Sequence, residues 1–150
     1  MRQIPKKNYV FALLILIVTV PLTFFLIDTF KNNKGDYKIK MVEIKENELD
    51  NYLTETTETI IYFSNENNEE LNKSVDKYVL KSEFKENTVY LNSSEVSNDF
   101  LVSFEKKYNG KNIEQPSLIL IEEGKITHIK NIEHNSDIKI FFKVAEVIND

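Results

Sequence analysis

The feature that most constrains this chain of 150 residues is a run of 19 residues without a charge at positions 9–27. Leu, Ile, Val and Phe make up most of the run. A helix of this length would span about 28 Å, which is close to the hydrocarbon thickness of a bilayer. A buried helix of a globular domain would carry a polar stripe, and this run has none. We therefore predict a transmembrane helix over residues 9–27, which leaves residues 28–150 to form a folded domain.

A cleaved signal peptide is the alternative for the same segment. Such a peptide has a shorter apolar region and ends at small residues, whereas this run continues into Ile27-Asp28-Thr29-Phe30. We therefore favour an uncleaved signal anchor, preceded by a short cytoplasmic segment over residues 1–8. Lys and Arg flank the run in nearly equal number, so the positive-inside rule gives only weak support for a C-terminal domain outside the cytoplasm.

The part of the chain after the apolar run is acidic. The whole chain has 19 basic and 24 acidic residues, and the first 27 residues hold three of the basic ones and none of the acidic ones. Residues 28–150 therefore carry a formal charge of −8, which nucleic acid and anionic lipid head groups would repel. We predict no nucleic-acid partner, and attachment to the membrane through residues 9–27 alone. Many Asn and Lys residues beside only 3 Gly and 3 Pro are typical of AT-rich genomes, which favours a bacterial plasma membrane.

The apolar patterns of residues 37–150 predict an α/β domain, joined to the apolar run by a polar linker over residues 28–36. Residues 59–63 are continuously apolar, which is typical of a central strand covered on both faces. The predicted strands cover residues 37–44, 59–63, 88–91, 117–121 and 125–130, and the predicted helices cover residues 45–54, 68–84, 96–108 and 137–148. Strand–helix–strand units favour parallel crossovers, and Glu122-Glu123-Gly124 predicts a tight hairpin. The sheet should therefore be mixed, with helices on both faces.

Three local sequences in this order resemble the thioredoxin-like superfamily. The first is Val42-Glu43-Ile44, which leads into a helix and then into the strand at residues 59–63. The second is Thr88-Val89-Tyr90-Leu91-Asn92. The third covers residues 107–125 and contains Gln115-Pro116-Ser117. The third is the most specific, because in the family a cis-proline followed by Thr or Ser leads into a strand and a glycine turn. The resemblance covers residues 37–150. It implies a thioredoxin-like mixed sheet flanked by helices, and a cis peptide bond between Gln115 and Pro116.

The chain departs from the family where the family carries Cys-x-x-Cys, at the start of the helix after the central strand. By the resemblance, the two cysteine positions fall near Asn68 and Leu71, and the chain has no cysteine. Thiol–disulfide exchange needs one thiolate to attack and one thiol to resolve. The sequence therefore predicts a redox-inactive relative that is not an enzyme; an enzyme with a non-thiol reaction is the least favoured alternative.

The resemblance also implies a binding surface. In redox-active relatives, the loop before the cis-proline pairs through its backbone with an extended polypeptide. The corresponding residues here are Asn67, Asn68, Glu114, Gln115 and Pro116. We predict a protein or peptide partner for this surface. The alternative is an accessory role in the export or maturation of small secreted peptides such as bacteriocins, because anchored thioredoxin-like proteins that act in that process are similar to this chain.

We predict no metal site and no cofactor. His128 and His134 do not stand in a metal-ligand spacing, and a strand residue and a loop residue in contact with solvent account for them. Glu66, Glu69 and Glu70 lie at the start of a predicted helix, where carboxylates favourably oppose the helix dipole. They lack the alternating ligands and the glycine of a calcium loop.

Overall fold

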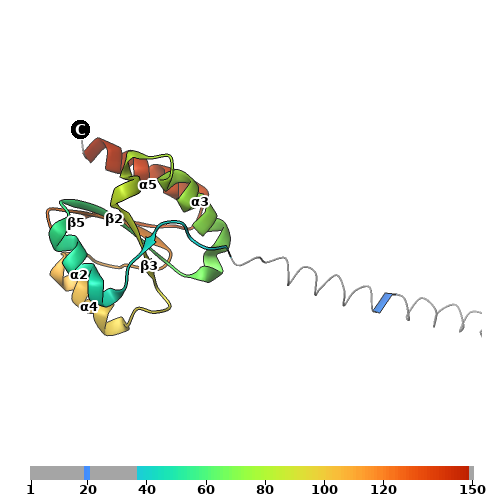
Figure 1. Ribbon diagram of the computed structural model, residues 1–150, viewed down its shortest axis with the longest axis horizontal. Coiled ribbons are helices and arrows are strands. Elements are labelled where there is room, and N and C mark those ends of the chain that lie inside the picture. Colours follow the sequence, from blue (N-terminus) through green and yellow to red (C-terminus); the bar gives the residue numbers. More distant parts are fainter. Residues whose placement is uncertain (1–18, 21–36, 149–150) are drawn as a thin grey trace, which may run out of the picture. The chain divides into compact units, whose positions relative to one another are not determined.

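The computed structural model describes residues 19–20 and 37–148 (Figure 1). The chain divides into two compact units, Met1–Tyr37 and Lys38–Asp150. The predicted cytoplasmic segment, transmembrane helix and linker (residues 1–8, 9–27 and 28–36) lie outside the described residues, except for Thr19 and Val20, which are helical. Within the described part of the chain, no helix has both the length and the apolar character needed to cross a bilayer.

The second unit is a mixed five-stranded sheet covered by helices, as predicted. The strands are β1 (Val42–Glu43), β2 (Glu58–Ser64), β3 (Thr88–Asn92), β4 (Ser117–Glu122) and β5 (Lys125–Asn131). The α-helices are α2 (Glu46–Glu55), α3 (Glu69–Val79), α4 (Asn98–Lys107) and α5 (Asn135–Ile148), and the short 3-10 helices η1 (Glu66–Asn68) and η2 (Glu83–Asn87) flank α3. The strand order is β1-β3-β2-β4-β5. Strands β1 and β2 run parallel to β3, whereas β4 is antiparallel to both β2 and β5.

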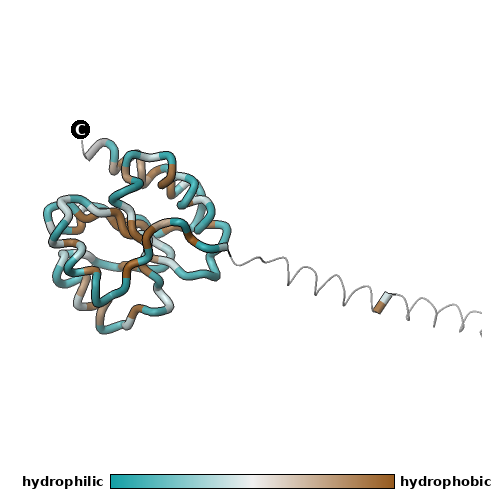
Figure 2. The backbone as a smooth tube through the Cα atoms, in the orientation of Figure 1, coloured by the Kyte–Doolittle hydropathy of each residue, from teal (hydrophilic) through white to brown (hydrophobic). Residues whose placement is uncertain are grey.

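Strand β2 lies at the centre of the sheet, as its continuous apolar run predicts. Its residues from Thr59 onward are all buried. Alternate side chains enter two different cores, because successive residues of a strand point to opposite faces. Ile60 and Tyr62 belong to the core under α3 and α5, and Ile61 and Phe63 to the core under α2 and α4. Figure 1 shows these two helix pairs on opposite sides of the sheet, and Figure 2 shows the hydrophobic stretches concentrated in the strands between them.

The first strand is shorter than predicted. The prediction of a strand over residues 37–44 is wrong for its first part, because only Val42 and Glu43 pair with β3. The backbone N–H of Lys40 donates instead to Asp76 Oδ2 on α3, at 2.9 Å. Ile39 and Met41 pack against the core under α3 and α5. These contacts draw the chain toward one helix face before it enters the sheet.

The predicted helix over residues 68–84 is two elements. Helix α3 ends at Val79, and the N–H groups of Lys81 and Ser82 donate to Tyr78 O at 3.1 Å, a tighter pattern than that of an α-helix. The chain then turns, and η2 places Phe84 in the core under α3 and α5. Thr88 Oγ1 donates to the carbonyl of Phe84 at 2.7 Å and leads into β3.

Several turn residues have a left-handed backbone conformation, with a positive φ. Glu123 and Gly124 have φ values of 48° and 72° in the β4–β5 hairpin, as a two-residue turn of type I′ requires. Helix α4 ends through Asn109, with a φ of 58°, and the N–H of Gly110 donates to Glu105 O at 2.8 Å. Asn109 and Gly110 together therefore end the helix, with Asn109 in the left-handed position. The peptide bond between Gln115 and Pro116 is cis, as predicted.

Candidate functional site

Three loops meet beyond the carboxyl end of β2. They are the loop that leads from Ser64 into η1, the loop that follows β3, and the loop that ends at the cis-proline. The N–H of Ser93, just after β3, donates to Ser64 O at 2.7 Å and joins the first two loops. The carbonyl of Pro116 accepts from the N–H of Ile132 at 2.8 Å, which fixes the third loop to the end of β5.

The amide of Gln115 connects all three loops. Its Oε1 accepts a hydrogen bond from Asn65 Nδ2 at 3.0 Å and a second one from Ser93 Oγ. These partners are 50 and 22 positions away along the chain. Gln115 is thus held through the oxygen of its side-chain amide. The side-chain oxygen of this predicted site residue therefore positions the loop, although the residue is exposed.

Asn65 organises the start of the helical segment after β2. It caps η1 with an extended backbone, and its Oδ1 accepts from the N–H of Asn67 at 3.0 Å. The same oxygen accepts from Asn68 Nδ2 at 3.3 Å, and Asn68 also donates to Ser64 Oγ at 3.1 Å. Asn is a preferred capping residue because its short side chain satisfies N–H groups that have no helical partner. The two predicted site residues in this loop therefore depend on Asn65, which the sequence analysis missed.

A buried network of hydrogen bonds, centred on Asn72, holds the backbone of Asn65 in place. Asn72 on α3 is only 1% exposed and accepts from Tyr62 OH at 2.7 Å and from Ser64 Oγ at 3.3 Å. Asn72 Nδ2 donates to the carbonyl of Asn65 at 3.0 Å. Burial raises the pKa of Tyr62 to about 12, so its hydroxyl stays protonated and acts as the donor. The network ties the central strand, α3 and the capping loop into one unit.

A second buried tyrosine, Tyr90, lies at the same end of the sheet, and carboxylates affect its pKa. Tyr90 OH donates to Ser64 O at 3.1 Å. Burial raises the pKa of Tyr90, and the negative charges of Glu43, Glu66 and Glu95 raise it further. Three carboxylates from three segments therefore act on one hydroxyl beside the loop junction.

The backbone at the cis-proline loop is open. Glu114 and Gln115 are exposed and belong to no helix or strand. Among the described residues, their backbone N–H and C=O groups take part in no hydrogen bond within the chain. A backbone group is a strong hydrogen-bonding group that is normally paired with protein or water. These groups are therefore accessible to a partner that offers its own backbone.

The structure places the predicted site residues in three different ways. Gln115 and Asn68 are brought together through Asn65, while Pro116 is half-buried and fixed to the end of β5. Asn67 and Glu114 are exposed at the rim. The missed residues are Asn65, Ser93 and Asn72. The first two could have been found from sequence, because both directly follow strands that run parallel, and ligand sites of α/β sheets lie beyond the carboxyl ends of such strands.

The two histidines lie apart from this site. His128 on β5 stacks on the ring of Phe141, with 5.4 Å between ring centroids, and burial lowers its pKa. His134 is exposed in the turn before α5. Within residues 19–20 and 37–148, no three His, Asp or Glu side chains gather in a way that could hold a metal ion.

The chain is similar to solved structures of one fold. No known protein family and no curated protein matches the sequence. The structure is similar to mitochondrial thioredoxin 3 from Saccharomyces cerevisiae in its oxidized form, with a TM-score of 0.51 and 13% identity over 69% of this chain and 93% of the yeast chain. A redox protein from Chlamydomonas reinhardtii gives a TM-score of 0.48 and 12% identity over 71% of this chain and 36% of that protein. A candidate oxidoreductase with a thioredoxin fold gives a TM-score of 0.46 and 16% identity over 66% of this chain and 92% of that protein.

The likeness to the yeast protein establishes a thioredoxin-like fold for this chain. It also corrects one prediction. The prediction that the chain is not an enzyme is wrong as an exclusion, because the yeast structure whose fold the chain shares is named as a thioredoxin; this likeness shows the fold alone. The absence of cysteine concerns only the thiols of this chain and does not exclude the whole class of enzymes. The predicted membrane anchor, bacterial origin and likeness to bacteriocin-related proteins find no support in these comparisons.

Proposed function

We propose that residues 38–150 form a thioredoxin-like binding module that holds an extended polypeptide at the cis-proline loop without using a thiol. One observation carries the proposal: Glu114 and Gln115 are exposed residues, and their backbone groups have no hydrogen-bond partner among the described residues. An extended peptide binds to such groups by adding its own backbone as a further strand. Side chains at alternate positions of that peptide would then contact the rim of the site.

The loop is organised before a partner arrives. Gln115 is fixed on both sides, by Asn65 and by Ser93, and the carbonyl of Pro116 is bound by Ile132. A rigid loop loses little conformational entropy on binding, so more of the interaction energy appears as affinity. This preorganisation supports a role in recognition for the loop, beyond that of a connection between strands.

The charge of the site indicates which polypeptides it would bind. Glu43, Glu66 and Glu95 lie close enough to affect one hydroxyl group, and Glu114 is exposed on the neighbouring loop. Complementary charge speeds association and excludes partners of like charge. We therefore propose a basic polypeptide segment as the partner.

The proposed setting is the outer face of a bacterial plasma membrane, with residues 9–27 as the anchor. The length and apolarity of that run and the composition of the chain support this setting. An accessory role in the export or maturation of small secreted peptides such as bacteriocins is the second proposal, and the acidic site favours it for cationic peptides. Its test is a deletion of the gene followed by quantification of secreted peptides by mass spectrometry. Unchanged secretion would contradict this second role.

Photo-crosslinking tests the binding surface directly. A photoreactive residue at Glu114 replaces a side chain that has no hydrogen bond among the described residues, and Val102, 67% exposed on α4, provides the control position. We expect one polypeptide to be captured from Glu114 and not from Val102. The double variant Glu66→Gln/Glu95→Gln should reduce the yield, whereas Glu83→Gln/Glu123→Gln, which removes two exposed carboxylates elsewhere, should not. Equal capture from both positions, or none from either, would show that this surface does not bind a partner.

A further inference from the structure

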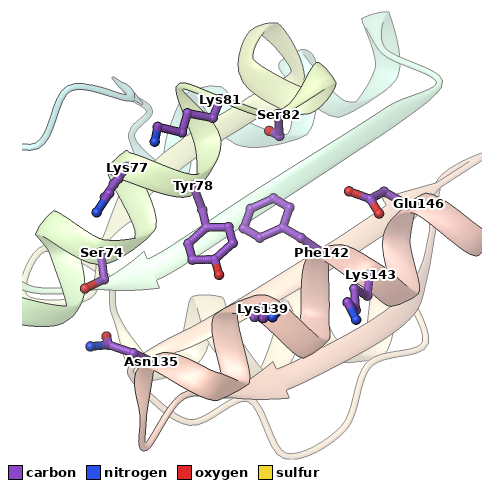
Figure 3. A pocket seen from close by; sticks show the side chains of 10 residues that line it. All are labelled: Ser74, Lys77, Tyr78, Lys81, Ser82, Asn135, Lys139, Phe142, Lys143 and Glu146. Carbon is purple, nitrogen blue, oxygen red and sulfur yellow. The ribbon is translucent and has the colours of Figure 1, made fainter.

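A groove of about 660 Å³ lies between α3 and α5, and none of the loops of the proposed binding site contributes to it (Figure 3). Its walls carry four lysines and its floor two aromatic rings. These residues are Lys77, Lys81, Lys139, Lys143, Tyr78 and Phe142. The volume is within the range of about 300–1,000 Å³ that is typical of ligand sites. The groove is therefore large enough to receive a segment of another molecule.

The groove is positively charged in a chain whose net charge is −5. Glu146 is the one carboxylate among its lining residues, against four ammonium groups. Within the part of the chain that the structure describes, none of these four lysines forms an ion pair, although Lys73, Lys85, Lys107 and Lys130 elsewhere do. The positive charge is thus concentrated and is not neutralised by described neighbours.

Helix stability accounts for only part of this arrangement. Lys77 lies in the last turn of α3 and Lys81 just beyond it, where a positive charge favourably opposes the helix dipole. Lys139 lies near the start of α5, where the dipole gives it no such advantage. It also stands four residues before Lys143, and like charges at this spacing on a helix repel each other. The helix dipole therefore does not explain Lys139, whereas Lys143 stands three residues before Glu146, a favourable spacing for opposite charges.

The floor of the groove is apolar and partly open. The rings of Tyr78 and Phe142 stack with 6.1 Å between centroids and 4° between planes. Phe142 is 3% exposed, whereas Tyr78 is 37% exposed and lies between the two rows of lysines (Figure 3). A ligand in the groove would therefore meet an aromatic surface in the middle and positive charges along both sides.

We propose that this groove binds an acidic segment of a polypeptide partner, in which apolar side chains contact Tyr78 while carboxylates pair with the flanking lysines. The lysines are distributed along two helices and do not converge on one point (Figure 3), so charges spread along an extended chain fit them better than one phosphate group. The lining has no arginine and no glycine-rich loop, the groups that cradle phosphates most closely. This site is independent of the proposed function at the cis-proline loop.

The test is a binding titration with the full chain in a mild detergent. The probe is a fluorescein-labelled decapeptide that alternates Glu with Leu and Phe, followed by fluorescence anisotropy at low salt. Lys77→Gln/Lys139→Gln removes two groove charges, and we expect it to weaken binding about fivefold, as the loss of two exposed ion pairs would. The control Lys106→Gln/Lys125→Gln removes two exposed lysines outside the groove and should leave the affinity unchanged.

A second comparison examines the aromatic floor. Tyr78→Gln should weaken binding of the Glu/Leu/Phe peptide and leave unchanged the weaker binding of a Glu/Ser peptide of equal charge. Equal weakening by both lysine pairs would overturn the proposal, since it would indicate long-range attraction without a site. Tighter, groove-dependent binding of inorganic tripolyphosphate or of a single-stranded oligonucleotide would also overturn it, because the ligand would then be a phosphate compound and not a peptide.

Discussion

The substitution Asn72→Ala is the sharpest test of how the fold supports the loop junction. Asn72 is almost fully buried on α3 and makes three hydrogen bonds through one amide. It accepts from Tyr62 OH and Ser64 Oγ and donates to the carbonyl of Asn65. Alanine at this position keeps the helix and removes all three bonds at once. The substitution therefore separates the network from the secondary structure around it.

The expected loss of stability follows from what each partner can do without Asn72. Tyr62 is fully buried, so its hydroxyl is left without an acceptor, at a cost of about 1–3 kcal/mol. The carbonyl of Asn65 is closer to solvent and water can replace part of its bond, so its loss costs about 1 kcal/mol. Ser64 Oγ still accepts from Asn68 and adds little. We expect Asn72→Ala to lower the free energy of unfolding by about 2–4 kcal/mol, a large share of the ~5–15 kcal/mol of a typical domain.

Urea unfolding of the chain, followed by far-ultraviolet circular dichroism because the chain has no Trp, measures this loss. Tyr62→Phe alone should cost about 1 kcal/mol, since Asn72 keeps its bond to Ser64. In the double variant, the tyrosine hydroxyl that Asn72→Ala leaves unpaired is absent. The two losses should therefore be less than additive, with a coupling of about 1–2 kcal/mol. Additive losses, or a loss below about 1 kcal/mol for Asn72→Ala, would refute the reasoning.

Three further predictions concern stability. The backbone N–H of His134 is the main group that lowers the pKa of Asp137, from 3.8 to about 2. The stability that the ionised carboxylate provides should therefore be lost as the pH falls through this interval. The urea midpoint of the Asp137→Asn variant should show no such loss. Because burial raises the pKa of Tyr62 from 10.0 to about 12, stability should fall as the pH rises through that interval, and Tyr62→Phe should reduce the slope; an unchanged slope would contradict this. Phe141→Ala should cost about 3–5 kcal/mol in the same assay, because Phe141 is a fully buried residue of α5, whereas Val102→Ala on the exposed face of α4 should cost under about 0.5 kcal/mol.

Apolar periodicity and turn residues correctly predicted the elements that depend on neighbouring residues in the chain. The apolar run of β2, the helices α2, α4 and α5, and the hairpin at Gly124 lie where the sequence predicts them. The two errors have long-range causes. Lys40 leaves the sheet because its N–H is bound by Asp76, 36 positions away, and the helix over residues 68–84 breaks because Phe84 is drawn into a core built by distant strands. The apolar pattern of a short stretch of sequence carries no information on either of these two contacts.

The candidate site was predictable only in outline. The resemblance pointed to Gln115 and Pro116 through a short motif, and the cis peptide bond is present. It did not point to Asn65 or Ser93, since each meets Gln115 only after the sheet brings three loops together. It also did not show that the side chain of Gln115 is engaged within the chain, which leaves its backbone as the group open to a partner. Motifs indicate where a surface lies, whereas tertiary contacts decide which atoms it presents.

The position of β2 has a consequence for synthesis of the chain. Its parallel neighbour β3 follows within about thirty residues, but Phe63 finds its antiparallel partner only at Ser117. While the chain emerges from the ribosome, a continuously apolar strand therefore has one open edge until β4 has been made. Contacts between distant segments slow folding, and an exposed apolar edge is prone to pair with other chains. This central strand is consequently the segment of the described domain for which a nascent-chain chaperone would matter most.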